Sequence, residues 1–172
     1  GQKFDQIESP CQANLEAIIE RAIEVGINHF ETARGYGNSE LQLGKILPKL
    51  PRDEIIVQTK VGLFEEAQEF PDNFETSMGL MQVDKFDLLG LHGINTTDSL
   101  DKALRPGGCL DAAEKLREQG RVDYIGFSTH GRTETILEAI ESDRFDYVNL
   151  HWYYIFQDNR PAIEAAAQRD MG

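Results

Sequence analysis

Apolar and polar residues alternate along this chain in two periods, one typical of strands and one typical of helices. Five short apolar runs predict strands, and their near-continuous Ile, Val, Leu and Phe content is typical of a buried parallel sheet. These runs cover residues 27–31, 54–60, 86–92, 124–128 and 146–151. Parallel strands need long crossover connections, so helices are expected between them.

The stretches between the apolar runs are amphipathic with helical spacing, and each predicts a helix. The predicted helices cover residues 13–25, 39–47, 72–82, 110–120, 133–140 and 158–170. Ser39 is the predicted N-cap of the second helix, since its hydroxyl can accept from backbone N–H groups of the first turn. The acidic residues 65–69 and the residues 93–109 are expected to form loops.

Strand and helix repeat in units of about 30 residues, which indicates an α/β fold with a parallel sheet. A doubly wound open sheet usually carries GxGxxG after its first strand, and no such motif or P-loop occurs here. Polar residues at several consecutive strand ends favour a TIM-type (β/α) barrel instead. We therefore expect an incomplete barrel of about five strands, in a single domain over residues 1–172.

The composition of the chain indicates which kinds of partner and which cellular compartment to expect. The formal net charge is −13, which argues against a nucleic-acid-binding protein because phosphate contacts need a basic surface. No apolar run is long enough to span a membrane. Cys11 and Cys109 lie far apart and form no CxxC pair, so reduced thiols in a cytoplasmic protein are expected.

Polar side chains follow or end three of the predicted strands. Glu31, Lys60 and His92 each close an apolar run, and Tyr36 lies in the glycine-rich loop after the first of them. Chemistry in barrels takes place at the carboxyl ends of the strands. By period-two alternation, a deeper layer of the same inward face consists of His29, Gln58, Gly90 and Tyr147.

Four segments carry a resemblance to a known family. HFETARGYGNSELQLGKIL, VQTKVG, DLLGLHG and GRVDYIGFSTHG resemble the aldo-keto reductases in order, spacing and local sequence. The IGFS-x-HG form is similar to a bacterial branch of aldo/keto reductase-like oxidoreductases. The resemblance implies a TIM barrel that reduces small aldehydes and ketones to alcohols with NADP(H), through an Asp, Tyr, Lys, His tetrad.

Carried over by position, the resemblance implies a role for each matching residue. Tyr36 matches the proton-donor tyrosine, Lys60 the lysine and His92 the histidine. Ser128 matches a serine that binds the nicotinamide carboxamide. Asn149 occupies the position of a glutamine that usually binds the same carboxamide. A free phenol has a pKa of about 10, so a nearby ammonium is needed to stabilise the phenolate during proton donation.

The chain departs from the family pattern in two ways. Glu31 stands where the family has Asp, which keeps the charge and adds a methylene, so the ion pair with Lys60 is expected to survive. The family barrel has eight strands, and this chain is expected to lack the first and the last two. Uncovered sheet edges favour association, so a homo-oligomer is a further expectation.

Two alternatives stay open at this stage. A zinc hydrolase would use imidazoles and a carboxylate at strand ends, and the candidates are His29, Glu31, His92 and His151. A reductase-like module could instead hold a cofactor or partner without turnover. The substrate and the choice of NADPH over NADH are not determined by the residues of this chain.

Overall fold

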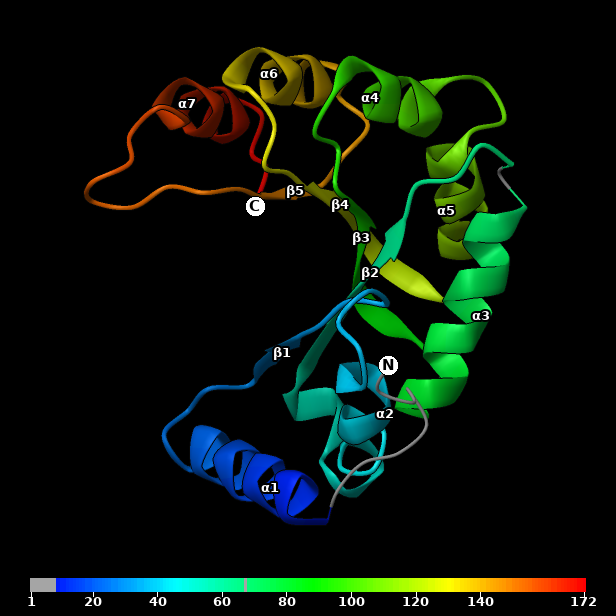
Figure 1. Cartoon of the computed structure of the whole chain (residues 1–172), viewed down its shortest axis with the longest axis vertical. Helices are drawn as coiled ribbons and strands as arrows, with labels where there is room; N and C mark the ends of the chain where they lie inside the picture. Colours follow the sequence, from blue (N-terminus) through cyan, green and yellow to red (C-terminus); the bar gives the residue numbers. More distant parts are fainter. Residues whose placement is uncertain (1–8, 67) are drawn as a thin grey trace.

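The computed structural model describes residues 9–66 and 68–172, and its sheet has five parallel strands in the order of the sequence. The strands are β1 (His29–Glu31), β2 (Ile56–Gly62), β3 (Phe86–His92), β4 (Val122–Ser128) and β5 (Tyr147–Asn149). Each predicted strand is present, and the sheet curls along its width (Figure 1). The curled parallel sheet is that of an incomplete TIM barrel, which confirms the predicted fold class.

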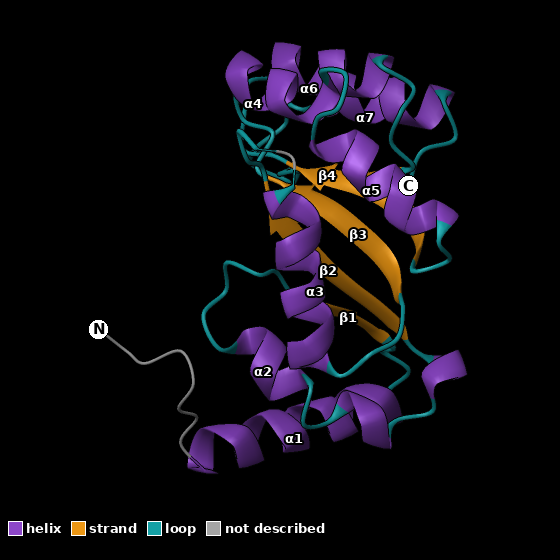
Figure 2. Cartoon of the chain, turned by 90° about the vertical axis from the view of Figure 1, so that its right-hand side faces the viewer, coloured by secondary structure: helices purple, strands orange, loops and turns teal. Residues whose placement is uncertain are grey.

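The helices all lie on the convex side of the sheet in the described part of the chain (Figures 1 and 2). They are α1 (Ser9–Glu24), α2 (Ser39–Leu43), α3 (Glu69–Met81), α4 (Thr97–Leu104), α5 (Cys109–Glu118), α6 (Thr133–Glu141) and α7 (Arg160–Gln168). Two short 3-10 turns, Leu47–Lys49 and Arg52–Glu54, precede β2. No helix within the described ranges is long and apolar enough to cross a membrane.

The core lies between the sheet and these helices. On each strand, every second side chain points toward the helices and is part of this core. The fully buried ones are Val57, Val61, Leu89, Leu91, Ile125 and Phe127. The opposite, concave face carries Gln58, Lys60 and Asn149, and it leaves Ile56 and Tyr124 exposed. Function is therefore to be sought on the concave face, since the convex face is sealed by packing.

The free edge of β5 is partly paired. The Val148 amide donates to the Gly172 carbonyl at 3.0 Å, and the Gly172 amide donates to the Asp146 carbonyl at 3.0 Å. This alternation is the hydrogen-bond pattern of a parallel pair of strands. Gly172 thus continues the order of the sheet beyond β5.

One helix was not expected. Residues 93–109 were predicted to be a loop, but Thr97–Leu104 form α4. The Thr96 and Ser99 side chains form a reciprocal capping box at its start, which satisfies amides that would otherwise lack partners. Leu100 and Ala103 bury its inner face.

The start of α2 also differs from the prediction. Asn38, not Ser39, occupies the N-cap position, and no side chain caps the helix. The Ser39 hydroxyl instead accepts a hydrogen bond from the Thr32 hydroxyl at 2.7 Å, which ties the helix to the end of β1. The helix ends at Leu43, so the predicted span of 39–47 was too long.

The described residues of the acidic stretch 65–69 are exposed, and its last residue is helical. Glu69 begins α3, and Ala67 lies outside the described residues. The Glu65 carboxylate contacts the Lys102 ammonium at 2.8 Å and the Arg105 guanidinium at 3.3 Å. Its hydrogen bond from Lys102 is the main reason that the pKa of Glu65 is lowered.

Candidate active site

Lys60 is the centre of the residues gathered at the carboxyl ends of β1, β2 and β3. Its side chain is only 2% exposed, yet it carries an ammonium group. The Nζ atom lies 2.6 Å from Glu31 Oε1 and donates to the Thr32 carbonyl at 2.9 Å. A buried ammonium needs such partners because loss of hydration is costly. Glu31, whose side chain is one methylene longer than the Asp of the family pattern, thus forms the expected ion pair with Lys60.

Tyr36 lies beside this ion pair on the loop between β1 and α2. The Lys60 ammonium lies 4.9 Å from the centre of the Tyr36 ring, and the His92 ring meets the same ring edge to face at 5.5 Å. The ammonium therefore faces the ring of Tyr36. Glu31 and Thr32 hold the ammonium, and Tyr36 is 52% exposed beside it.

Glu40 anchors the loop that carries Tyr36, and sequence reasoning missed this role. Its carboxylate is 1% exposed and binds the Arg34 guanidinium at 2.8 Å and the Thr59 hydroxyl at 2.7 Å. The Arg34 amide also donates to the Lys60 carbonyl at 2.9 Å. Because Arg34 and Thr59 are close in sequence to Tyr36 and Lys60, Glu40 fixes the two functional side chains relative to each other.

His92 is held in its neutral form by its surroundings. Its pKa is lowered from 6.5, first by burial and then by the positive charges of Lys60 and His130, against an opposing effect of Glu31. A neutral imidazole can donate one hydrogen bond and accept another. At neutral pH, His92 can therefore donate to a ligand oxygen without carrying a charge.

The pKa of His92 gives a test of this electrostatic arrangement. Lys60→Met should raise the pKa of His92, since it removes a repelling positive charge, and Glu31→Gln should lower it further. Histidine ring protons followed by NMR against pH measure both shifts. Lys85→Met, which removes an exposed lysine paired with Asp123, should leave the His92 titration unchanged. An unchanged pKa in Lys60→Met would contradict the arrangement.

The same lowered pKa predicts a dependence of stability on pH. The unfolded chain binds a proton at His92 near pH 6.5, whereas the folded chain resists it to lower pH. Acidification below about pH 6.5 therefore favours the unfolded state. The loss of folding free energy reaches its full size once the pH has fallen below the lowered pKa of His92 in the folded chain.

Ser128 and Asn149 lie side by side at the ends of β4 and β5, where they are partners in the strand register. The Ser128 hydroxyl oxygen accepts from the Gly93 amide at 3.2 Å, so its own O–H remains able to donate. Asn149 Oδ1 accepts from Gln58 Nε2 at 3.0 Å. A hydroxyl and a carboxamide in this position match the hydrogen-bonding groups of a nicotinamide carboxamide.

The zinc alternative requires a cluster of ligands. Within residues 9–66 and 68–172, no group of three or more His, Cys, Asp or Glu side chains is placed to hold a metal ion. His29 bonds to Gln58, and the His151 ring meets the His130 ring edge to face with ring centres 4.5 Å apart. The four candidate ligands thus have separate partners, and His130 and His151 lie exposed at the rim.

The aromatic residues after β5 do not form a closed pocket. Trp152 and Tyr153 are about half exposed, and Tyr154 is 95% exposed. The Trp152 indole donates to Gln157, while Tyr153 and Phe156 lie close together. This segment is a surface loop between β5 and α7.

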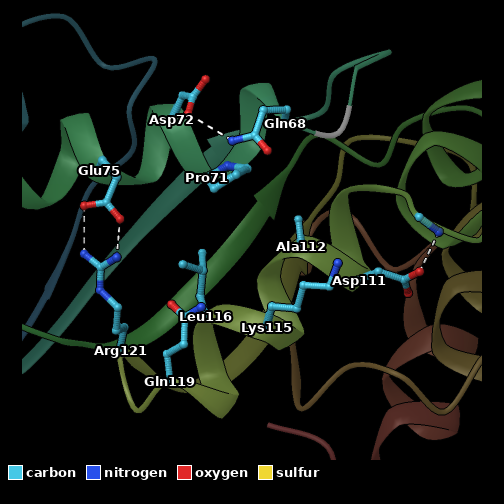
Figure 3. Close-up of a pocket in the computed structure, with 11 residues that line it drawn as sticks. Gln68, Pro71, Asp72, Glu75, Asp111, Ala112, Lys115, Leu116, Gln119 and Arg121 are labelled. Carbon is cyan, nitrogen blue, oxygen red and sulfur yellow. Dashed lines mark hydrogen bonds and ion pairs between the residues drawn. The ribbon is translucent and has the colours of Figure 1, made fainter.

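A groove of about 430 Å³ lies between α3 and α5, on the outer side of the sheet (Figure 3). Two of its carboxylates are already paired, Glu75 with Arg121 and Asp111 with Arg144. Gln68 donates to Asp72 within the same groove. None of the residues at the carboxyl ends of the strands lines it, so the groove belongs to helix packing and not to the candidate site.

Comparison with known proteins agrees with this fold. A model of the aldo/keto reductase family matches residues 4–171. The chain is 30% identical over 150 residues to "Probable aldo-keto reductase 1" of Glycine max, a match that covers 79% of this chain and 41% of the relative.

Solved structures show the same fold. An aldo-keto reductase from Bacillus halodurans in its holo form superposes with a TM-score of 0.80 at 25% identity, covering 94% of this chain and 56% of that one. An aldo/keto reductase from Klebsiella pneumoniae in complex with NADP and acetate superposes with a TM-score of 0.79 at 19% identity, covering 95% and 57%.

The class of protein follows from the family model together with the curled parallel sheet. This chain belongs to the aldo/keto reductase family. It spans about two fifths of the length of the Glycine max relative.

Proposed function

We propose that this chain carries the catalytic groups of an NADP(H)-dependent aldo-keto reductase that reduces small aldehydes and ketones to alcohols. The observation that supports the proposal most is the ion pair of buried Lys60 with Glu31. Its ammonium lies over the Tyr36 ring, next to neutral His92. A phenol, an ammonium and an imidazole at one strand edge are suited to delivering a proton to a reduced carbonyl oxygen.

Each residue has a separate task in the proposed reaction. Tyr36 donates its phenolic proton to the carbonyl oxygen, and the ammonium of Lys60 stabilises the phenolate that remains. Glu31 holds that ammonium in place at 2.6 Å. Neutral His92 donates a hydrogen bond to the same carbonyl oxygen, which orients the substrate and stabilises its developing negative charge.

Ser128 and Asn149 are the proposed contacts to the cofactor. Both lie on the strand edge next to His92, because His92 pairs with Ser128 and Ser128 with Asn149 in the register. A bound nicotinamide would supply the hydride. The two side chains would hold its carboxamide and so fix which face of the ring is turned toward Tyr36.

Further properties of the protein are proposed from composition and exposure. The net charge of −13 fits small-molecule partners in the cytoplasm, with no role for nucleic acid or membrane. Residues 1–172 are proposed to form a single partial-barrel domain. Exposed Ile56 and Tyr124 on the concave face favour association, including a homo-oligomer.

Cofactor binding by the full-length protein tests the proposal. Titration with NADPH and with NADH, followed by nicotinamide fluorescence, should give saturable binding. Asn149→Ala should raise the Kd by about three- to tenfold, because one hydrogen bond to the carboxamide is lost. Asn159→Ala, which alters a carboxamide bonded to the His151 carbonyl beyond β5, is the matched control and should leave the Kd unchanged.

The result separates the proposal from its alternative. Binding of either cofactor without carbonyl turnover would favour a reductase-like binding module. Failure of a folded sample to bind NADPH or NADH would contradict both.

A further inference from the structure

A buried polar network lies on the concave face, one layer below the candidate active site. Gln58 is its centre and is only 1% exposed. Gln58 Oε1 lies 2.9 Å from His29 Nε2, while Gln58 Nε2 donates to the Tyr147 hydroxyl at 3.3 Å and to Asn149 Oδ1 at 3.0 Å. The network links β1, β2 and β5.

Two glycines make room for the network. A Cβ atom at Gly126 would lie 2.5 Å from the Tyr147 ring carbon Cγ, so the ring crosses β4 where no side chain intervenes. A Cβ atom at Gly90 would lie 3.0 Å from Lys60 Cγ and 3.4 Å from the Tyr147 hydroxyl. Burial, followed by the charge of Glu31, raises the pKa of Tyr147, so the phenol stays neutral.

The direction of these hydrogen bonds is set by Gln58. A carboxamide has one donating and one accepting end. Because Gln58 Nε2 faces Asn149, Asn149 turns its Oδ1 inward and is left with its Nδ2 group to offer elsewhere. Because Gln58 Oε1 can only accept, its bond to His29 requires the tautomer with the proton on Nε2.

We propose that Gln58 is a positioning residue that fixes the orientation of the Asn149 carboxamide, so that Asn149 presents N–H donors to the cofactor. This inference rests on the proposed function, since it assigns the direction of the contact between Asn149 and a nicotinamide. Asn149 then donates to the carbonyl oxygen of the nicotinamide carboxamide and does not accept from its NH2 group. Without Gln58, either end of Asn149 can face the cofactor.

An analogue of the cofactor distinguishes the two directions. The 3-acetylpyridine analogue of the nicotinamide dinucleotide keeps the carbonyl oxygen and lacks the NH2 group. Kd values for the normal cofactor, for the analogue and for the adenosine half of the cofactor are to be measured with the full-length protein. The ratio of the analogue Kd to the normal Kd reports how strongly the protein uses the NH2 group.

Gln58→Leu should raise this ratio about threefold, because a freed Asn149 can then accept from the NH2 group that the analogue lacks. The Kd of the adenosine half should not change. Gln58→Leu should have no further effect in an Asn149→Ala background, since Gln58 acts through Asn149. Gln58→Met is the second variant if the leucine variant does not fold.

Tyr147→Phe is the matched control. It removes the other acceptor of Gln58 Nε2 and keeps the Gln58–Asn149 bond, so the ratio should stay at the wild-type value. An unchanged ratio in the Gln58 variants, or equal weakening of the adenosine half, would overturn the inference while the proposed function stood. No binding of either dinucleotide by the wild-type protein would overturn both.

Discussion

Replacing Tyr36 with phenylalanine is expected to lower the kcat of carbonyl reduction about a thousandfold, because it removes the proton donor and nothing else. The ring is kept, so the contacts with Lys60 and His92 persist. The Kd for the cofactor should therefore stay within about twofold of the wild-type value. Steady-state kinetics and a binding titration on the full-length protein measure the two quantities.

The matched control for Tyr36→Phe is Tyr154→Phe, since Tyr154 is 95% exposed on the loop after β5. This variant should match the wild type in both quantities. A fall in kcat of less than about tenfold in Tyr36→Phe would contradict the role of Tyr36 as general acid. Equal losses in both variants would contradict it as well, because a hydroxyl far from the site would then matter as much.

The second large effect concerns the stability of the fold. Gly44→Ala is expected to lower the free energy of unfolding by about 3 kcal/mol, because the added methyl group would overlap the Leu80 carbonyl. The obstacle is backbone in α3, which cannot rotate away as a side chain could. Chemical denaturation, followed by circular dichroism, measures the loss.

Gly79→Ala is the control for this substitution. Gly79 lies exposed within α3, and a Cβ atom there would meet nothing within 4 Å. Alanine is the better helix former, so this variant should gain about 0.5–1 kcal/mol. A loss of stability in Gly79→Ala, or none in Gly44→Ala, would show that α2 and α3 do not pack as the structure has them.

The strands were predictable because their signal is local. Each apolar run has the composition of a buried strand, and β3 begins and ends at the predicted residues. Helix α4 was missed because its sequence is mostly polar and only Leu100 and Ala103 are buried. Its start signal is a hydrogen-bonded pair, Thr96 with Ser99, that is easily taken for part of a loop.

The site was predictable only in part. Glu31, Lys60 and His92 could be placed together because carboxyl ends of parallel strands share one edge. The anchoring role of Glu40 could not be seen, since it depends on the path of the loop from Arg34 to α2. Gln58 was placed in the deeper layer, but its bond to Asn149 depends on how far the sheet curls.

The fate of the hydride tests the central claim most directly. The full-length protein is to be incubated with a small aldehyde and with NADPH or NADH that carries deuterium at the transferable position. The account predicts an alcohol with one deuterium on the former carbonyl carbon, formed only when protein is present. An absence of labelled alcohol from a folded protein that binds the cofactor would contradict the claim that this site reduces carbonyls.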